Sequence, residues 1–574
     1  MSGPRTLLGD EALALGAIHA GLSAAYGYPG TPSTEIMEYL QDAAASPGGP
    51  DLPAPRPLED GGGFIARWCA NEKTALEAAL GTSFSGKRSL VTMKHVGLNV
   101  AADPFMNGSL LGIRGGLVIV VADDPGMHSS QGEQDSRFYA SFAMVPCLEP
   151  RSQQEAYDMA REAFDLSEGF HLPVMIRLVT RLSHARAAVR CSPPGSQNPL
   201  SKAEDKTEWM LLPVYARKNY AALLEKQEGL RHWSEEHPAN RLELENRDAG
   251  YAVITSGLGG NYYEENLADF AAARGKMPVR LHIGAYPLPE ESLRRLCTGA
   301  GEVLILEEGQ PFIEERIRGI LPQTMTVRGR LGPGENAVPR TGELDPDNVR
   351  AALGLPPRRS VLDAVSSPAP PLVDPALIPP RPPQLCAGCP HADSYETINR
   401  AAAALDPSPD RSRVSVNSDI GCYSLGASPP YSAVESIVCM GASIGMARGA
   451  AEAGIPYAFA VIGDSTFIHS GLPALIDAVE AEVSMTVIIL DNSAVAMTGC
   501  QKTALPSARL TGLILGTGLD PAHCLELEAK KQFIEENAAA LQREAEHRGP
   551  SVVILRRECL EAARKRIRRP AAGV

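Results

Sequence analysis

Residues 457–492 read YAFAVIGDSTFIHSGLPALIDAVEAEVSMTVIILDN, and this stretch decides the fold. The apolar run at 457–462 predicts a β-strand, and the segment from about 469 to 482 predicts a helix. A second apolar run, rich in β-branched residues, predicts another strand at 485–490. A strand, a helix and a second strand in this order indicate an α/β sheet.

Polar residues lie at the tips of both predicted strands, where open α/β sheets bind ligands. Asp464 offers a carboxylate oxygen, Asn492 an amide oxygen and Ala494 a main-chain carbonyl. Mg²⁺ binds oxygen ligands of this kind, usually together with a substrate phosphate. The turn at Gly463 and Ser465 would let backbone amides approach the same phosphate. Two buried strands with ordinary turn residues would explain the same pattern.

The composition is that of a large acidic globular protein. A length of 574 residues favours three or four domains. The net charge of −14 argues against a nucleic-acid-binding surface. No apolar run reaches the length of about eighteen residues that predicts a membrane span. Eleven cysteines, with no signal-peptide core at the N-terminus, indicate the reducing cytoplasm.

The pattern along the chain predicts several α/β domains. Residues 1–190 alternate predicted strands (89–93, 117–121, 174–178) with predicted helices (10–20, 71–79, 154–166), as in a doubly wound domain. The rest of the sequence predicts a linker and charged helical connector at 191–248 and a smaller α/β unit at 249–360. A proline-rich linker is predicted at 361–384 and a last α/β domain at 385–574.

Further polar residues follow predicted strands in the first domain. Thr31 lies in the glycine- and proline-rich turn of 27–40, Glu72 begins an alanine-rich helix, and Lys94 and His95 follow the strand at 89–93. The dense polar run ADDPGMHSSQ follows the next strand, at 122–131. These groups suit binding or proton transfer. Each also has an ordinary structural explanation, such as a helix cap or a glutamate that complements a helix dipole.

The cysteines form one CxxC pair and several single residues. Cys386 and Cys389 lie in CAGCPH, while Cys422, Cys439 and Cys500 follow separately. A CxxC in a cytosolic protein binds Zn²⁺, performs thiol redox chemistry or holds an iron–sulfur cluster. The sequence has no second CxxC, which a structural zinc site usually needs. The pattern is compatible with a cluster held in a cleft and also with inert buried thiols.

In their order along the chain, these motifs resemble one family: the large (α) subunit of indolepyruvate:ferredoxin oxidoreductase, among the thiamine-diphosphate (ThDP)-dependent 2-oxoacid:acceptor oxidoreductases. The resemblance covers nearly all of residues 5–560. The stretches that carry it are GYPGTPSTE (27–35), NEKTALEAA (71–79), VTMKHVGLNVAADP (91–104), VIVVADDPGMHSSQ (118–131), LCAGCPHADSY (385–395), DIGCYSLG (419–426), CMGASIGMA (439–447), GDSTFIHSGLPALIDA (463–478) and LDNSAVAMTG (490–499).

The resemblance implies a multi-domain α/β architecture with two doubly wound ThDP-binding domains. Residues 1–190 would bind the pyrimidine ring, 249–360 would form a transketolase-C-like middle domain, and 385–574 would bind the diphosphate and Mg²⁺. In this family ThDP sits between its pyrimidine and diphosphate domains, often across a subunit interface. We therefore expect a homodimer of this chain within a hetero-oligomer that includes a small β- or γ-type subunit.

The resemblance also implies residue roles. Glu72 aligns with the glutamate that contacts the pyrimidine ring of ThDP, while Asp464, Asn492 and the carbonyl of Ala494 would hold Mg²⁺. Thr31, Lys94 and His95 would bind the 2-oxoacid carboxylate or move protons. The residues expected beside the cofactor are Gly421, Cys422, Gly441, Ala442, Ser443, Gly463, Asp464, Ser465, Asn492, Met497 and Thr498.

The implied reaction is oxidative decarboxylation of an aryl 2-oxoacid, such as indolepyruvate or phenylpyruvate, to an acyl-CoA, with electrons passing to ferredoxin or another acceptor. A 4Fe-4S cluster would use Cys386, Cys389 and Cys422, with Cys439 or Cys500 as the fourth ligand. Two further cysteines, at 524 and 559, have no cluster spacing.

The sequence departs from the family at its end. Family members usually continue into a C-terminal ferredoxin-like module, and this sequence ends at Val574 without one. Either a partner supplies the electron acceptor, or the chain does not use ferredoxin in the usual way, or the chemistry is that of a non-oxidative ThDP-dependent lyase. The missing module favours the lyase, whereas the CxxC and Gly-Cys motifs favour the oxidative enzyme. A catalytically silent regulatory subunit is a third alternative, against which Glu72, Asp464 and Asn492 argue.

Overall fold

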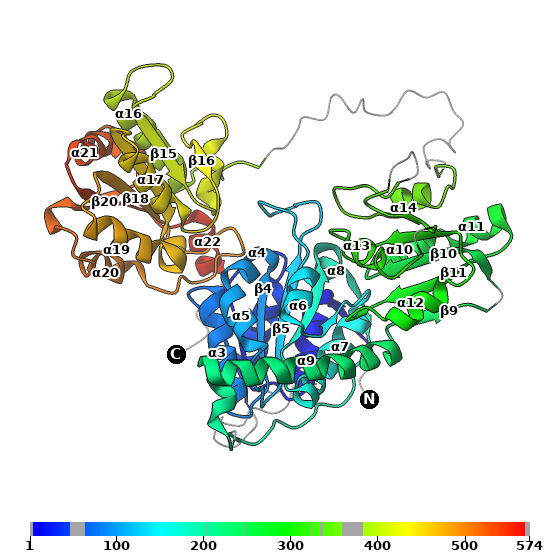
Figure 1. Ribbon diagram of the computed structural model, residues 1–574. Helices are drawn as coiled ribbons and strands as arrows, with labels where there is room; N and C mark the ends of the chain where they lie inside the picture. The colour runs from blue at the N-terminus through cyan, green and yellow to red at the C-terminus, as the bar shows by residue number, and fades with distance from the viewer. Residues whose placement is uncertain are drawn as a thin grey trace, which may run out of the picture. The chain divides into compact units, whose positions relative to one another are not determined.

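The computed structural model describes residues 4–45, 63–202, 204–245, 247–322, 324–332, 337–358 and 383–568. The chain divides into two compact units, Met1–Ser367 and Pro368–Val574 (Figure 1). The first unit contains both regions, 1–190 and 249–360, for which separate domains are predicted. Up to residue 382, the predicted proline-rich linker lies outside the described residues.

The first unit is built on a seven-stranded sheet with the order β12-β6-β7-β5-β4-β2-β3. Its strands are β2 (Ala24–Gly27), β3 (Ile65–Trp68), β4 (Ser89–Lys94), β5 (Leu117–Asp123), β6 (Cys147–Leu148), β7 (Val174–Val179) and β12 (Ala285–Tyr286). Strands β2 to β7 pair in parallel, and β12 joins β6 antiparallel. The strands predicted at 89–93, 117–121 and 174–178 are confirmed.

Helices cover both faces of this sheet. Along β5, Val118 and Val120 pack into the core on one face, while Ile119 and Val121 pack into the core on the other. Each buried apolar side chain of this kind contributes about 1.5–3 kcal/mol of transfer free energy. The first face carries α1 (Gly9–His19), α2 (Thr34–Ala45) and α7 (Gln153–Phe170), and the second carries α3 (Glu72–Phe84), α5 (Ala102–Gly108) and α6 (Arg137–Ala143). The doubly wound fold predicted for this region is confirmed.

A second sheet in the first unit has the order β14-β13-β10-β11-β9. Its strands are β9 (Arg241–Glu243), β10 (Asp248–Ser256), β11 (Pro278–Ile283), β13 (Glu302–Leu306) and β14 (Thr326–Arg328). Its helices are α10 (Gly259–Glu265), α11 (Leu267–Arg274), α12 (Glu290–Leu296), α13 (Phe312–Ile317) and α14 (Pro346–Ala352). The charged connector helix is α9 (Pro213–Glu236), and β1 (Arg5–Leu8) pairs antiparallel with β8 (Arg186–Val189).

The second unit contains a parallel sheet with the order β16-β15-β17-β18-β20-β19. Its strands are β15 (Val414–Ser418), β16 (Ser436–Ile437), β17 (Tyr457–Gly463), β18 (Met485–Asp491), β19 (Cys524–Glu528) and β20 (Pro550–Arg556). Along β18, Ile488 and Leu490 pack on one face, and Val487 and Ile489 on the other. The first face carries α16 (Pro390–Leu405) and α21 (Ile534–Glu546), and the second carries α17 (Ala442–Glu452), α19 (Leu472–Glu480) and α20 (Leu510–Leu515).

The helix after β17 begins earlier than predicted. It starts directly at the strand tip as α18 (Asp464–Thr466), continues through a π-helical turn (Phe467–Gly471) and ends as α19. Pro473 has no N–H to bond a carbonyl in the preceding turn, and such a residue normally marks a helix start. Here the wider π turn carries the helix past it.

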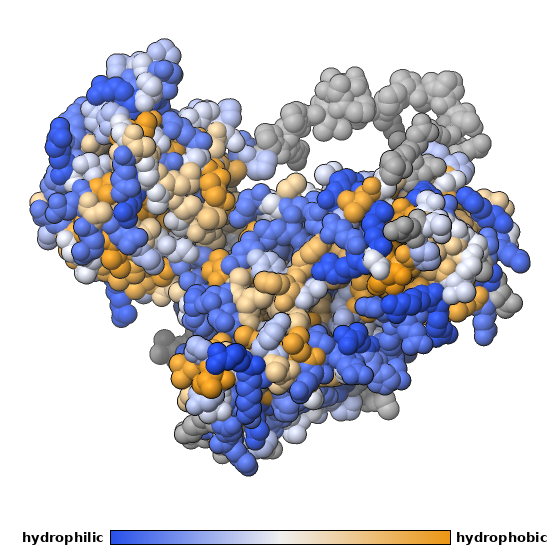
Figure 2. All heavy atoms as spheres, in the orientation of Figure 1, coloured by the Kyte–Doolittle hydropathy of each residue, from blue (hydrophilic) through white to orange (hydrophobic). Residues whose placement is uncertain are grey.

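Polar side chains cover much of the visible face of each unit, with hydrophobic residues among them (Figure 2). In the part of the chain that the structure describes, no helix is both long and apolar enough to cross a membrane.

Candidate active site

Four of the predicted site residues follow strands that lie side by side in the first sheet. Thr31 follows β2, Glu72 follows β3, Lys94 ends β4 and His95 begins α4 (His95–Val100). Because β2, β3 and β4 are adjacent and parallel, these residues meet at one edge of the sheet. The polar run after β5 reaches the same edge.

Glu72 is buried at the start of α3, with only 4% of its surface exposed. The side chain of Asn71 caps this helix by accepting a 2.9 Å hydrogen bond from the Thr74 amide. The Glu72 carboxyl lies against Gly97 of α4. A Cβ atom at position 97 would be 2.6 Å from Oε1 of Glu72, so the close approach requires glycine.

Lys94 joins the turn after β2 to the loop after β5. Its stem lies along Gly30, where a Cβ atom would be 3.1 Å from Cγ of Lys94. Its Nζ donates to the Ser129 carbonyl at 3.2 Å, and the Ser129 hydroxyl donates to the Thr31 carbonyl at 3.3 Å. Burial lowers the pKa of Lys94, although the carboxylates of Asp124 and Glu72 act in the opposite direction.

His95 is 1% exposed. Its Nε2 lies 2.9 Å from the carbonyl of Gly132, and because a carbonyl only accepts, Nε2 carries a proton. Its Nδ1 is buried and has no hydrogen-bond partner among the described residues. Asp124 holds the adjoining loop by accepting hydrogen bonds from the Ser129 amide at 2.8 Å and the Ser130 hydroxyl at 2.7 Å.

In the second unit, β17 and β18 are adjacent and parallel, so Asp464 and Asn492 lie at the same sheet edge. Asp464 is buried, and its Oδ2 has no hydrogen-bond partner within the described residues. Burial raises the pKa of Asp464 well above its usual range, and the negative charge of Asp491 is the second cause. A divalent cation would stabilise the ionised carboxylate of Asp464, so this residue fits Mg²⁺.

Asn492 is held by two hydrogen bonds. Its Oδ1 accepts from the Ala494 amide at 3.1 Å, and its Nδ2 lies 3.0 Å from Nε2 of His391. Burial lowers the pKa of His391 to about 4, so the ring is neutral and Nε2 accepts the amide proton. His391 follows the CxxC motif directly, but its sequence context predicts no role in the site.

At the N-terminal end of α17, the Ser443 amide donates to the carboxylate of Asp419 at 3.3 Å, and the Ala442 amide donates to the Cys439 carbonyl at 3.1 Å. Gly441 has φ +90°, and a Cβ atom there would be 2.4 Å from that of Ser470. Burial raises the pKa of Asp419 to about 6. These amides therefore have a protein acceptor in this structure, and their contact with a diphosphate stays a prediction.

The other residues predicted beside the cofactor lie around the tips of β15, β17 and β18. Gly421 and Gly463 face the Tyr423 ring so closely that a Cβ atom at either position would be within 2.6 Å of it. The Ser465 amide donates to Asp464. In the loop after β18, Met497 is 54% exposed and the Thr498 hydroxyl donates to Gln501 at 2.7 Å.

Five thiols lie close enough for their charges to interact. Burial raises the pKa of Cys422 to about 12. The charges of four other thiols also raise this pKa: those of Cys386, Cys389, Cys500 and Cys559. Cys439 interacts with Asp419 instead. Among the described residues, no three or more His, Cys, Asp or Glu side chains are arranged to hold a single metal ion.

Cys559 lies among these thiols, although its spacing in the sequence did not predict a place in a cluster. It follows β20, whose end lies beside β18, and its amide donates to the Asn492 carbonyl at 3.0 Å. Arg557 binds the CxxC segment through Gly388 at 3.0 Å and Asp393 at 2.5 Å. Burial raises the pKa of Cys500, and the thiol of Cys559 lies close enough to raise it further.

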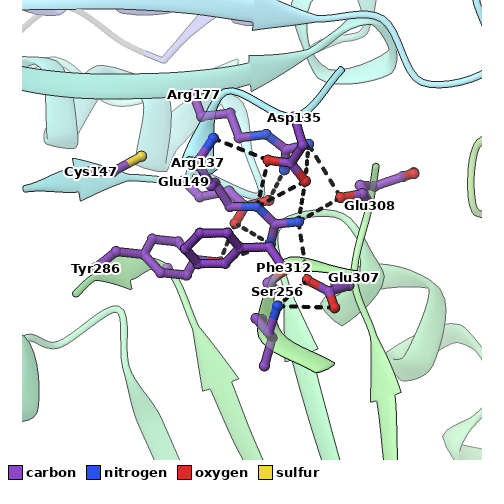
Figure 3. Close-up of polar contacts among 12 residues, drawn as sticks. Asp135, Arg137, Cys147, Glu149, Arg177, Ser256, Tyr286, Glu307, Glu308 and Phe312 are labelled. Carbon is purple, nitrogen blue, oxygen red and sulfur yellow. Dashed lines mark hydrogen bonds and ion pairs between the residues drawn. The ribbon is translucent and has the colours of Figure 1, made fainter. Parts of the chain in front are cut away.

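Within the first unit, a buried network of charged side chains joins the two sheets (Figure 3). Arg177 pairs with Glu149 at 2.5 Å, and Arg137 pairs with Glu307, after β13, at 3.1 Å. The Tyr286 hydroxyl donates to Glu149 at 2.5 Å. Burial raises the pKa of Glu307 to about 7.

Comparison with known proteins places this geometry in a family. Residues 15–244 match the family described as pyruvate flavodoxin/ferredoxin oxidoreductase, thiamine diP-binding, and residues 419–555 match the thiamine pyrophosphate enzyme, C-terminal TPP binding domain. Indolepyruvate oxidoreductase subunit IorA from Archaeoglobus fulgidus is 37% identical over 96% of this chain and 86% of its own length. The chain belongs to the IorA family of oxidoreductase subunits.

A second IorA subunit is similar to this chain at nearly the same identity, and one solved structure is more distantly similar. The IorA subunit of Methanothermobacter thermautotrophicus is 35% identical over 96% of this chain and 86% of its own length. A solved 2-oxoglutarate:ferredoxin oxidoreductase from Magnetococcus marinus is 16% identical, with a TM-score of 0.46 over 57% of this chain and 62% of that one. As an IorA-family member, the chain is a ThDP-dependent 2-oxoacid oxidoreductase that acts by oxidative decarboxylation.

Proposed function

We propose that this chain is the large subunit of a cytoplasmic complex that oxidatively decarboxylates an aryl 2-oxoacid, of the indolepyruvate or phenylpyruvate type, to an acyl-CoA. The IorA name of its relatives supports this substrate class and a small partner subunit. Electrons would pass through an iron–sulfur centre to ferredoxin or a similar acceptor. A second copy of this chain would complete the complex.

The observation that carries this proposal is the meeting of Glu72, Lys94 and His95 at one sheet edge in a chain of this family. ThDP, when bound, supplies the carbon centre that bonds to the 2-oxoacid and retains its electrons as CO₂ leaves. The Glu72 carboxyl would hold a proton at a ring nitrogen of the pyrimidine. Its buried place against Gly97 keeps water from competing for that proton.

The neighbouring residues would bind the substrate and move protons. The Nζ of Lys94 and the hydroxyl of Thr31 would bind the 2-oxoacid carboxylate, because an ammonium and a hydroxyl both donate to it. His95 has an unpartnered Nδ1 within the described part of the chain and can hold a proton there. The loop contacts of Ser129 keep Lys94 and Thr31 together.

In the second unit, Asp464, Asn492 and the carbonyl of Ala494 would hold Mg²⁺. The Oδ2 of Asp464, which has no hydrogen-bond partner in the part of the chain that the structure describes, supports this assignment. The ion would in turn bind the diphosphate, assisted by backbone amides near Gly463 and Ser465.

The thiols support a 4Fe-4S cluster held by Cys386, Cys389 and Cys422 with Cys559 or Cys500 as the fourth ligand. Anaerobic reconstitution, followed by iron and sulfide analysis and electron paramagnetic resonance after dithionite, tests this. We expect about four irons per chain. Cys559→Ser and Cys500→Ser are compared, and the variant that loses iron identifies the fourth ligand. Cys524→Ser is the control. No iron in the parent protein would assign the thiols to structure.

The reaction is tested with the chain and its partner subunit, supplied anaerobically with ThDP, Mg²⁺, indolepyruvate, coenzyme A and a redox dye. We expect acyl-CoA, detected by mass spectrometry, in step with dye reduction. An aldehyde formed without dye reduction would instead identify a non-oxidative lyase. No product at all, with ThDP bound, would identify a regulatory subunit.

A further inference from the structure

His391 makes two contacts to which the proposed reaction gives no role. Its main-chain N–H lies close enough to the thiol of Cys389 to oppose the rise in the pKa of that thiol that burial causes. Its side chain accepts a hydrogen bond from Nδ2 of Asn492, with 3.0 Å between the nitrogens. The residue therefore lies beside the thiol group with its backbone and contacts Asn492 with its imidazole.

The imidazole contact decides which way the Asn492 amide faces. An amide presents its oxygen on one side and its NH₂ group on the other, and a metal ion binds only the oxygen. If the amide were reversed, its oxygen would face the lone pair on Nε2 of His391, and the hydrogen bond from the Ala494 amide to Oδ1 would be lost. Two acceptors facing each other in a buried site are unfavourable.

The ring itself is held in place. Only 2% of the His391 surface is exposed. Its ring meets that of Tyr423 edge to face, with centroids 6.0 Å apart and planes at 73°. A ring packed in this way keeps Nε2 at a constant position relative to Asn492.

We propose that His391 is a positioning residue for Mg²⁺, which keeps Oδ1 of Asn492 turned to the ion without touching the ion itself. This inference rests on the proposed function, because it takes Asn492 as a ligand. Residues that orient a metal ligand typically change metal affinity about 10–100-fold when they are replaced.

The test uses the full-length chain and measures ThDP binding by isothermal titration calorimetry at increasing Mg²⁺ concentrations. We expect His391→Leu to raise the Mg²⁺ concentration for half-maximal ThDP binding by about tenfold or more. His391→Gln keeps an acceptor for the Asn492 amide, so it should restore binding to near the parental value. Iron content should be unchanged in both, because each keeps the main-chain N–H that lies beside Cys389.

Two further comparisons separate positioning from packing. In an Asn492→Ala background, His391→Leu should have no additional effect on Mg²⁺ dependence, since the group it orients is gone. His523→Leu, a histidine replaced elsewhere in the same unit, is the matched control and should behave as the parent. If His391→Leu does not fold, His391→Met provides the same comparison.

The outcomes are distinct. Parental Mg²⁺ dependence in folded His391→Leu, or an equal added loss in the Asn492→Ala background, would overturn the positioning role alone. A parent protein whose ThDP binding needs no Mg²⁺ would overturn the proposed metal site and the inference with it.

Discussion

At the scale of single residues, the candidate site depends on small neighbours as much as on its polar groups. Glu72 reaches its position only because residue 97 has no side chain, and the stem of Lys94 lies close along Gly30, where a Cβ atom would be 3.1 Å from it. Both glycines therefore act through the side chains packed against them.

We expect Gly97→Ala to lower turnover about 100-fold, because a displacement of about 1 Å in a catalytic group has that effect. Its new Cβ atom would overlap Oε1 of Glu72. Alanine favours helix over glycine, so weaker helix formation would not explain the loss. Steady-state dye reduction measures the effect. Gly81→Ala is the control, since a Cβ atom there meets nothing within 4 Å; equal loss in both variants would contradict the argument.

We expect Glu72→Gln to lower turnover by at least about 100-fold, the range that a positioned proton-transfer group supplies. The amide keeps the size of the side chain but does not exchange a proton as a carboxyl does. ThDP binding, measured by calorimetry, should persist. A variant with near-parental turnover would remove Glu72 from the reaction.

At the scale of elements, the two sheets of the first unit are joined by charges rather than by apolar side chains alone. Arg137 and Arg177 come from the first sheet and its helices, and Glu307 and Glu308 follow β13 of the second. The group is fully buried, so removing one partner would leave another charge without compensation. The two sheets are therefore expected to unfold together.

This network gives the first unit a specific pH dependence. Burial raises the pKa of Glu307 from 4.5 to about 7, so the folded state binds more protons than the unfolded state between those values. Stability should therefore fall as pH rises through that window, by about 3 kcal/mol at most for this group. Glu307→Gln keeps an acceptor for the Ile313 amide and should reduce the slope by the share of Glu307. Glu308, whose pKa burial also raises to about 7, would keep its own share.

Denaturant unfolding at a series of pH values from about 4.5 to 8 measures this slope. Glu315→Gln, an exposed neighbour on α13, is the matched control and should keep the parental slope. An unchanged slope in Glu307→Gln would show that the charge of Glu307 does not set the pH dependence.

At the scale of the whole molecule, the chain consists of two units with separate cores. The clusters around β18 contain only residues of the second unit, and those around β5 only residues of the first. We expect a fragment of residues 385–574 to unfold in a single cooperative transition, because its sheet is buried on both faces. Thermal circular dichroism measures this, with the full-length chain for comparison. A gradual transition would mean that the second unit needs the first to fold.

Sequence alone determined the family, most elements and most of the candidate site. Apolar periodicity is local, so strands such as β5 and β18 could be predicted within two residues. The sheet-edge residues Glu72, Lys94 and Asp464 could be predicted because chain order places them directly after strands. The helix after β17 was predicted to start near residue 469, whereas it begins at Asp464.

Only the tertiary structure decided which distant residues meet. Cys559 joins the thiols because β20 pairs with β18, and a cysteine with no local spacing motif carries no sign of that pairing. The contact between His391 and Asn492 spans 101 positions, and the charged network depends on the packing of two sheets. Such contacts follow from strand order and packing, which the chain sets through its whole core and not through any short pattern.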